Sequence, residues 1–447
     1  MNRDSKESAE LAEQINTHRD DPLTLEKIYR RALTLGAATQ FETAIAAGAQ
    51  HFPNSRALQA WVYRLNLADD DAEKRSARKR RWPLALALSA LQGIGFALLA
   101  DAQPPLPFPG PSVPAFWLGW APLMTLCVLA FLFVSDRRSA PGRIYAVSLC
   151  LLAALTATLA LLNAHREDDV AALIALHVPF ACWLLVGGTL VWRAGAIRKR
   201  LYIFVLKSLS TALTAGIYLA SGVVFGALSL GIFAALGIEW PDALIVRLAA
   251  LGLGAVPLWA LASTCDPADP LSLRDEPVSF LPLMHILGTL LTPLSIIVLI
   301  VYLVGFVPQH FFQPFYAREV LAVYNGALGA LMLLLVLVAS RPVAPRWNHL
   351  MRTACLLLSG LALALSTYAL AAIAYRLYEW GLTPNRLAVM GWNGIALVAI
   401  TTLLVHQWQH RTSHWIPLLQ RSLGGALLWI GPWIVGLCYA LSLYFPG

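Results

Sequence analysis

Charged residues are scarce in this sequence. They make up 13% of its 447 residues, whereas a soluble globular protein contains about 25%. The deficit lies after Trp82, where apolar runs of roughly 18 residues or more, long enough to cross a bilayer, follow one another. This pattern excludes a soluble enzyme and predicts an all-α, polytopic membrane protein.

Paired cysteines and the common catalytic motifs are absent. The six cysteines are scattered singly with no CxxC pair, so we expect neither a disulfide framework nor a structural metal site. There is no Walker loop, HExxH, GxSxG with partners or dinucleotide-binding glycine turn. We therefore expect no cofactor, and an enzyme is not the favoured interpretation. His406, His410 and His414 are spaced by four residues, but their place beside a span favours an interfacial segment over metal or haem.

The positive charge of the chain is best explained by membrane topology. The net charge is +8, and the basic residues gather at the ends of the apolar runs, as the positive-inside rule requires. The run KRSARKRR at 74–81 is an orientation signal that also suits anionic lipid headgroups. We expect membrane lipids as partners and no nucleic acid.

Eleven spans are predicted. Their approximate ranges are 83–100, 114–134, 144–163, 169–192, 203–237, 242–263, 280–307, 319–339, 350–378, 385–406 and 419–445. No secretory signal peptide precedes them, so we expect a cytoplasmic N-terminus. An odd number of spans then places the C-terminus in the periplasm.

Two predicted spans are longer than a bilayer needs. Segment 197–237 is expected to begin as an interfacial helix, with Arg198, Lys199, Arg200 and Lys207 on its wet face. It then crosses through a stretch rich in glycine and serine, which favours close helix packing over a lined path. Segment 279–307 contains Pro282 and Pro293, which we expect to separate a short interfacial piece from the span.

The residues before the first span form a helical head. Apolar spacing near 3.6 residues recurs over 5–16, 23–35, 39–52 and 55–67. The pattern is weakly tetratricopeptide-like, with one partial repeat. We divide the chain into a cytoplasmic helical domain at 1–70, a basic juxtamembrane linker at 71–82 and a membrane domain at 83–447. The head is either a docking module for a protein partner or a cap on the membrane domain.

Polar and ionisable residues gather at the outer ends of several spans. Such residues are costly at membrane depth and are candidate functional groups. The candidate substrate-binding residues are His177, Arg318, Glu319, Tyr324, Asn325, Arg376, Glu379, Asn385, Arg386 and Asn393.

Helical spacing groups some of these candidates on shared faces. Arg386 and Asn393 are seven residues apart, and Arg376 and Glu379 are three apart. Thr383 followed by Pro384 is typical of a helix start, whose positive end suits a carboxylate or phosphate. The alternative is that these side chains pair with one another and fix a loop.

Two segments carry a resemblance to a known family. REVLAVYNGALGALMLLL at 318–335 and YEWGLTPNRLAVMGWN at 378–393 are similar to signature segments of a bacterial inner-membrane family catalogued as a domain of unknown function. LTPLSIIVLIVYLVGF at 291–306 and the segment at 177–187 are similar in the same way. The resemblance covers roughly residues 80 to 440 and implies a polytopic bacterial inner-membrane protein, without implying an activity. The head lies outside it.

Three functions remain open. The first is transport or flipping of an anionic envelope-related molecule, gripped near the outer leaflet by arginines such as Arg318, Arg376 and Arg386. The second is a membrane scaffold or accessory subunit that recruits a partner through the head. The third is a membrane-embedded transferase acting on lipid-linked substrates, with Glu319 or Glu379 as the base.

Overall fold

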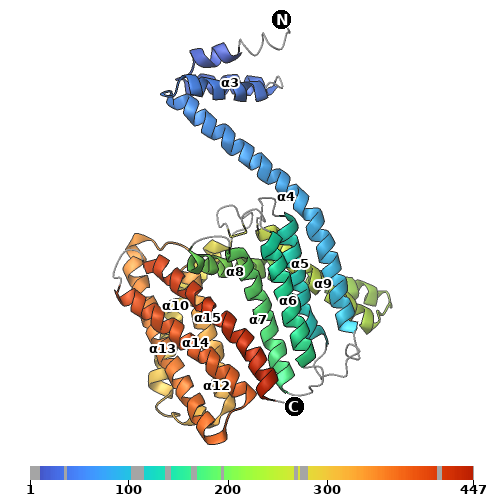
Figure 1. Ribbon diagram of the computed structural model, residues 1–447, viewed down its shortest axis with the longest axis vertical. Coiled ribbons are helices and arrows are strands. Elements are labelled where there is room, and N and C mark those ends of the chain that lie inside the picture. Colours follow the sequence, from blue (N-terminus) through green and yellow to red (C-terminus); the bar gives the residue numbers. More distant parts are fainter. Residues whose placement is uncertain are drawn as a thin grey trace. The chain divides into compact units, whose positions relative to one another are not determined.

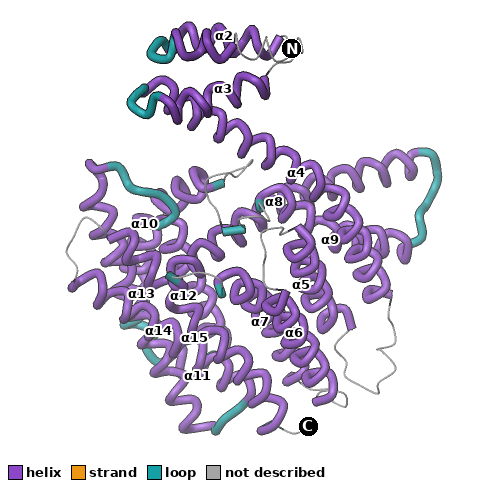
Figure 2. Tube along the Cα trace, turned by 45° about the horizontal axis from the view of Figure 1, so that its top comes forward, coloured by secondary structure: helices purple, strands orange, loops and turns teal. Residues whose placement is uncertain are grey.

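The structure of the chain is a computed structural model built entirely from helices and loops over the residues it describes (Figures 1 and 2). These residues are 11–34, 38–101, 115–135, 142–162, 169–192, 196–265, 270–271, 280–409 and 415–445. Only the backbone is described for 33–34, 38–39, 66–81, 101, 115, 161–162, 169 and 318. Contacts divide the chain into two compact units, Met1–Trp82 and Pro83–Gly447.

The first unit is a small helical head with an aromatic core. Residues 11–17 are helical, and α2 (Pro22–Thr34), α3 (Ala38–His51) and the start of α4 (Arg56–Asp101) follow. Asp21 caps α2, because its Oδ1 accepts a hydrogen bond from the backbone N–H of Leu23 at 3.0 Å. Trp61 packs edge-on to Phe41, with ring centroids 5.3 Å apart. Over the residues that the structure describes, the predicted helices of the head form and share one hydrophobic core; residues 5–10 of the first predicted helix and residue 35 of the second lie outside them.

The basic stretch expected as a linker is helical. The α4 backbone continues through residues 71–82 and past Pro83 to Asp101, so one helix belongs to both units. Proline at 83 removes one helical hydrogen bond without ending the helix. The side chains of KRSARKRR lie outside the described part of the chain.

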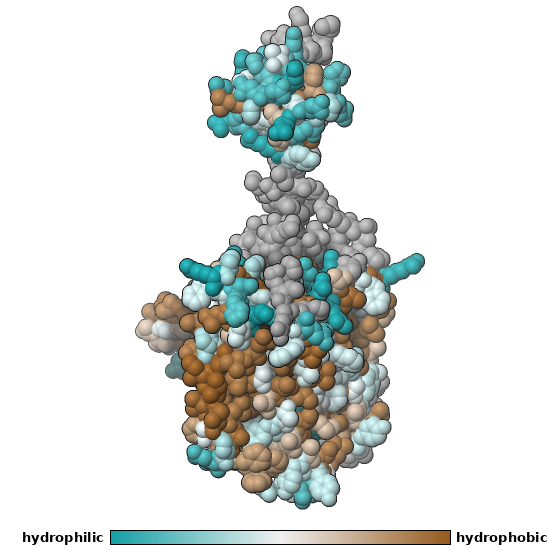
Figure 3. Space-filling view, turned by 90° about the vertical axis from the view of Figure 1, so that its left-hand side faces the viewer, coloured by the Kyte–Doolittle hydropathy of each residue, from teal (hydrophilic) through white to brown (hydrophobic). Residues whose placement is uncertain are grey.

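The second unit contains the predicted membrane helices. They are α5 (Ala115–Ser135), α6 (Gly142–Leu162), α7 (Asp169–Val191), α8 (Ile197–Ala235), α9 (Asp242–Thr264), α10 (Leu281–Ile300) with the π-helix η1 (Val301–Phe306), α12 (Arg318–Val338), α13 (Pro345–Trp380), α14 (Pro384–Gln409) and α15 (Trp415–Tyr444). With the last part of α4, the described residues give 11 helices long and apolar enough to cross a membrane. The all-α, multi-pass prediction is confirmed. On the face shown in Figure 3, apolar side chains form a broad zone between more polar ends.

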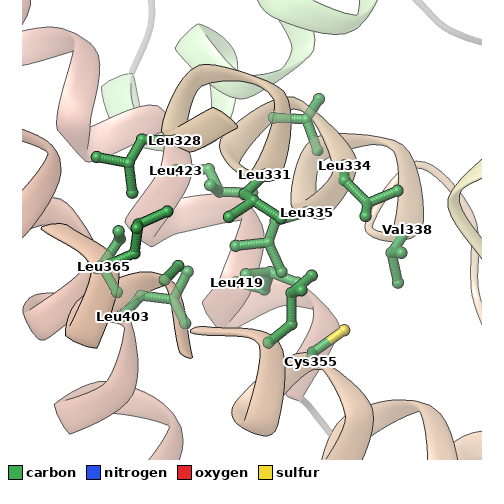
Figure 4. Packing of buried hydrophobic residues seen from close by; sticks show 14 of the residues in the cluster. Leu328, Leu331, Leu334, Leu335, Val338, Cys355, Leu365, Leu403, Leu419 and Leu423 are labelled. Carbon is green, nitrogen blue, oxygen red and sulfur yellow. The ribbon is translucent and has the colours of Figure 1, made fainter. Parts of the chain in front are cut away.

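Two of the hydrophobic clusters in the described part of this unit join most of its helices. The larger cluster joins α8, α10, α12, α13, α14 and α15, and leucines such as Leu331, Leu335 and Leu365 fill it (Figure 4). The second joins α5, α6, α7 and α15, with Ala388 contributed by α14. Helices α14 and α15 therefore belong to both clusters.

Glycine allows the closest helix crossings. A Cβ at Gly424 of α15 would overlap the carbonyl oxygen of Arg198 in α8, and a Cβ at Gly288 of α10 would lie 2.6 Å from the backbone nitrogen of Val338 in α12. Only glycine fits positions where two backbones approach this closely.

Two expectations about the long segments are wrong. Lys207 is not on a wet face: it is 7% exposed and its Nζ donates to the carbonyl of Thr264 in α9 at 3.3 Å. Helix α8 is continuous over Ile197–Ala235, and an interfacial position for its first part stays a prediction. Helix α10 runs unbroken through Pro293, and Pro282 sits in its first turn, where a proline removes no helical hydrogen bond.

The small-residue face of α8 packs on nothing within the described chain. Gly216, Gly222, Gly226 and Gly231 have no neighbouring atom near the place a Cβ would occupy. Large apolar side chains around them, such as Phe225, are mostly exposed. The expected close packing is therefore not found among the described residues.

Candidate functional site

The turn between α13 and α14 is built around Gly381 and Thr383. Gly381 ends α13 with φ of +71°, a conformation that favours glycine. Helix α14 begins at Pro384, and the side-chain oxygen of Thr383 accepts the N–H of Arg386 at 3.4 Å. The predicted N-cap and first helical position are confirmed. This tight turn holds the positive end of α14 beside the last turn of α13.

Two arginines are positioned around Trp380. The Cζ of Arg376 lies 5.4 Å from the ring centroid of Trp380, and that of Arg386 lies 5.8 Å from the same centroid. Distances of this size are typical of cation–π contacts. The two Cζ atoms are therefore no more than about 11 Å apart, the sum of these two distances.

Hydrogen bonds to backbone carbonyls also orient each guanidinium group. Nη1 of Arg386 donates to the carbonyls of Trp380 at 2.8 Å and Gly381 at 2.6 Å, while Nη1 of Arg376 donates to the carbonyl of Tyr316 at 2.9 Å. These neutral acceptors orient the two guanidinium groups. Arg376 has further interactions beyond these. The turn therefore carries two oriented guanidinium groups.

A pocket of about 850 Å³ opens beside this turn. Four of the ten candidate residues line it, namely Asn325, Arg376, Asn385 and Arg386. The other lining residues are Ala172, Leu173, Leu176, Leu321, Ala322, Ile373, Thr383, Pro384 and Val389. Helices α7, α12, α13 and α14 all contribute. Among the residues that the structure describes, no aspartate or glutamate lines the pocket.

A buried pair of amides lies next to the pocket. Nδ2 of Asn393 donates to Oδ1 of Asn325 at 2.5 Å and to the carbonyl of Val389 at 2.9 Å. Asn393 is 1% exposed and its Oδ1 has no partner among the described residues. Because the carbonyl of Asn325 is engaged by Asn393, its NH₂ group is the donor available for a ligand. The pocket therefore offers mainly hydrogen-bond donors.

His177 has a structural role, because its ring connects two helices by hydrogen bonds. Its Nε2 accepts the indole N–H of Trp392 at 2.9 Å, and its Nδ1 contacts the carbonyl of Leu173 at 2.7 Å. The two contacts assign a neutral ring with the proton on Nδ1. His177 is 3% exposed and is not part of the pocket wall. It joins α7 to α14.

Tyr324 belongs to an aromatic network and not to the pocket wall. Its hydroxyl lies 2.6 Å from that of Tyr302, and its ring packs beside Tyr368, whose hydroxyl donates to the carbonyl of Phe311 at 2.6 Å. This network fixes the segment between η1 and α12. The carbonyl of Tyr316, which holds Arg376, lies in the same segment.

The remaining candidates are not among the residues that line the pocket. Glu319 and Glu379 are exposed and do not line it. Arg318 begins α12, but its side chain lies outside the described part of the chain. Asn393 does not line the pocket but donates a hydrogen bond to Asn325, which does.

Sequence reasoning missed several residues that build the site. Trp380 and Tyr316 position the arginines, yet aromatic residues at span ends are so common in membrane proteins that they carry no specific signal. Ala172, Leu173 and Leu176 supply the α7 wall, and nothing distinguishes them in sequence from other lipid-facing aliphatic residues. Only the packing of α7 against α14 and α15 brings them to the pocket.

No protein-family model matches the sequence, and neither a curated protein nor a solved structure matches it significantly. The candidate site therefore rests on the chemistry and geometry of the chain itself.

Proposed function

We propose that this multi-pass membrane protein binds an anionic envelope-related molecule in the pocket between α7, α12, α13 and α14, and transports or flips it across the membrane. The observation that carries the proposal is the convergence of Asn325, Arg376, Asn385 and Arg386, from three helices, on one pocket. Guanidinium groups and amide donors suit a phosphate or carboxylate.

The charge balance of the pocket supports an anion over a cation. Two arginines approach it, the N-terminus of α14 adds positive potential, and no described acidic side chain lines it. Both acids considered as a catalytic base, Glu319 and Glu379, are exposed and are not among the lining residues. This favours binding and movement of a ligand over acid–base transfer chemistry.

We place this pocket at the periplasmic side of a bacterial inner membrane. The placement follows from the loop charges, which favour a cytoplasmic N-terminus, and from the resemblance of segments 318–335 and 378–393 to a bacterial inner-membrane family. Successive spans cross in opposite directions, so the starts of α7, α12 and α14 and the end of α13 share one side. The pocket contains residues from these ends.

Binding of a soluble anion tests the proposal. Inorganic diphosphate is titrated calorimetrically into the purified protein in a nonionic detergent. A charge-assisted hydrogen bond contributes about 1.5–3 kcal/mol, so Arg386→Ala is expected to weaken binding by about 10- to 100-fold. Arg421→Ala is the matched control, because Arg421 is an exposed arginine outside the pocket. Equal affinities for the wild type and Arg386→Ala would contradict the proposal.

The second candidate function is a scaffold that recruits a protein through residues 1–70. Among its described residues, the head exposes two large hydrophobic side chains, Leu23 at 67% and Tyr63 at 69%, which suit a protein contact. Deletion of residues 1–70 separates the two functions. A transporter keeps its diphosphate affinity without the head, whereas a scaffold loses its partner.

A further inference from the structure

The walls of the pocket are more apolar than an inorganic anion requires. Polar groups come from the turn and from Asn325, whereas Leu173, Leu176, Leu321 and Ile373 line the rest with other aliphatic side chains. A phosphate group has the volume of only a few water molecules, each about 30 Å³. The pocket, at about 850 Å³, therefore has room for a substantial apolar part as well.

The apolar wall reaches the lipid-facing surface of the membrane helices. Leu176 of α7 is 61% exposed, and Ala172 of α7 and Ala322 of α12 are also exposed. All three lie within candidate membrane spans. Exposed aliphatic side chains at that depth face acyl chains. The pocket thus continues from its arginines to the surface that lipid covers.

The two helices on either side of this apolar wall are poorly joined. Helix α7 packs against α5, α6, α15 and α14, while α12 packs against α10, α13 and α14. Within the described residues, the backbones of α7 and α12 approach each other closely at few places, if any. A hydrocarbon chain is the occupant whose chemistry fits a side opening between membrane helices.

Building on the anion site proposed above, we propose that the ligand is an anionic lipid. Its headgroup lies between Arg376 and Arg386, and its hydrocarbon chain leaves the pocket sideways between α7 and α12, past Leu176 and Ala322. A lipid confined to the bilayer also reaches the pocket at a high effective concentration, which a dilute soluble anion does not.

The test compares a lipid with its soluble headgroup and blocks the side opening. The protein is reconstituted in nanodiscs of phosphatidylcholine containing a photoactivatable phosphatidylglycerol, and crosslinked peptides are identified by mass spectrometry. We expect crosslinks from the acyl chain on α7 and α12 around residues 172–176 and 321–325. Excess sn-glycerol 3-phosphate is expected to leave these crosslinks unchanged.

Ala322→Trp is the blocking variant, because Ala322 is exposed and lines the pocket. Val323→Trp is its control, because Val323 is the adjacent residue, is 67% exposed and does not line the pocket. Ala322→Trp should abolish the lipid crosslinks, and Val323→Trp should keep both the crosslinks and the affinity for diphosphate.

Two other outcomes separate this inference from the function on which it rests. Glycerol phosphate that competes fully with the lipid, together with crosslinks unaffected by Ala322→Trp, would overturn the lipid assignment while leaving the anion site intact. If Arg386→Ala changed neither the lipid crosslinks nor the affinity for diphosphate, the proposed function would be overturned as well.

Discussion

Replacing Asn393 with leucine tests whether the buried amide pair, Asn325 and Asn393, stabilises the fold or instead serves to orient Asn325 in the pocket. Leucine and asparagine side chains have the same number of heavy atoms, so the substitution leaves no large cavity. It removes the hydrogen bonds from Nδ2 of Asn393 to Oδ1 of Asn325 and to the carbonyl of Val389. It also removes Oδ1 of Asn393, which is buried with no partner among the described residues.

The expected magnitude follows from these two effects. A hydrogen bond between membrane helices contributes about 0.6 kcal/mol on average, whereas a buried polar atom without a partner costs about 1–3 kcal/mol. Asn325 is half-buried beside the pocket, so water can reach its freed carbonyl. The free energy of unfolding of Asn393→Leu should therefore be unchanged or raised by up to about 2 kcal/mol. Asn325→Leu loses the same bond but leaves the Asn393 amide buried, and should lower stability by about 1–2 kcal/mol.

The assay is unfolding in mixed micelles of a nonionic detergent and dodecyl sulfate, followed by circular dichroism. The double variant should match Asn393→Leu, because it removes both members of the pair. A loss for Asn393→Leu as large as that for Asn325→Leu would refute the reasoning, since the oxygen of Asn393 would then have to be satisfied.

Three further predictions concern other parts of the chain. Gly424→Ala should destabilise the membrane domain by about 1–3 kcal/mol through overlap with the α8 backbone, whereas Gly425→Ala, whose Cβ would meet only ordinary contacts, should be nearly neutral in the same unfolding assay. Trp61→Ala removes a 4% exposed ring from the core of the head and should cost about 3–5 kcal/mol there; faster proteolysis within residues 11–65 of the intact protein would report it, and unchanged proteolysis would contradict it. The pKa of Glu26 is lowered, chiefly by its hydrogen bond from Arg64, so its stabilising contribution is present at neutral pH and lost as the pH falls through this lowered pKa. Arg64→Ala should raise the pKa of Glu26, measured from its carboxyl carbon shift by NMR.

The membrane-spanning helices could be predicted because each one is determined by residues that are contiguous in the sequence. Each span is an apolar run of sufficient length, and the starts of α9 at Asp242 and α14 at Pro384 agree with sequence signals. The prediction of an exposed Lys207 is wrong because the residues that cover this side chain come from another helix. A lysine near other basic residues suggested a wet face, but the packing of α9 on α8 covers it.

The pocket could be predicted only in its polar half. Arg376, Asn385 and Arg386 were found because charged and amide groups are rare near apolar spans. Helical periodicity also put Arg386 and Asn393 on one face, yet only Arg386 lines the pocket, because Asn393 is covered by α12. The apolar wall from α7 comes from a helix more than 130 residues earlier in the chain, and no spacing rule connects them.

The central claim is that the arginine pair at the α13–α14 turn holds an anionic lipid. Native mass spectrometry of the protein purified in a mild detergent tests it directly, because the mass of a bound molecule is measured whatever its identity. Wild-type protein and Arg421→Ala should each carry a bound anionic lipid, and the double variant Arg376→Ala/Arg386→Ala should lose it while keeping its helicity. The same set of bound molecules on all three proteins would contradict the claim.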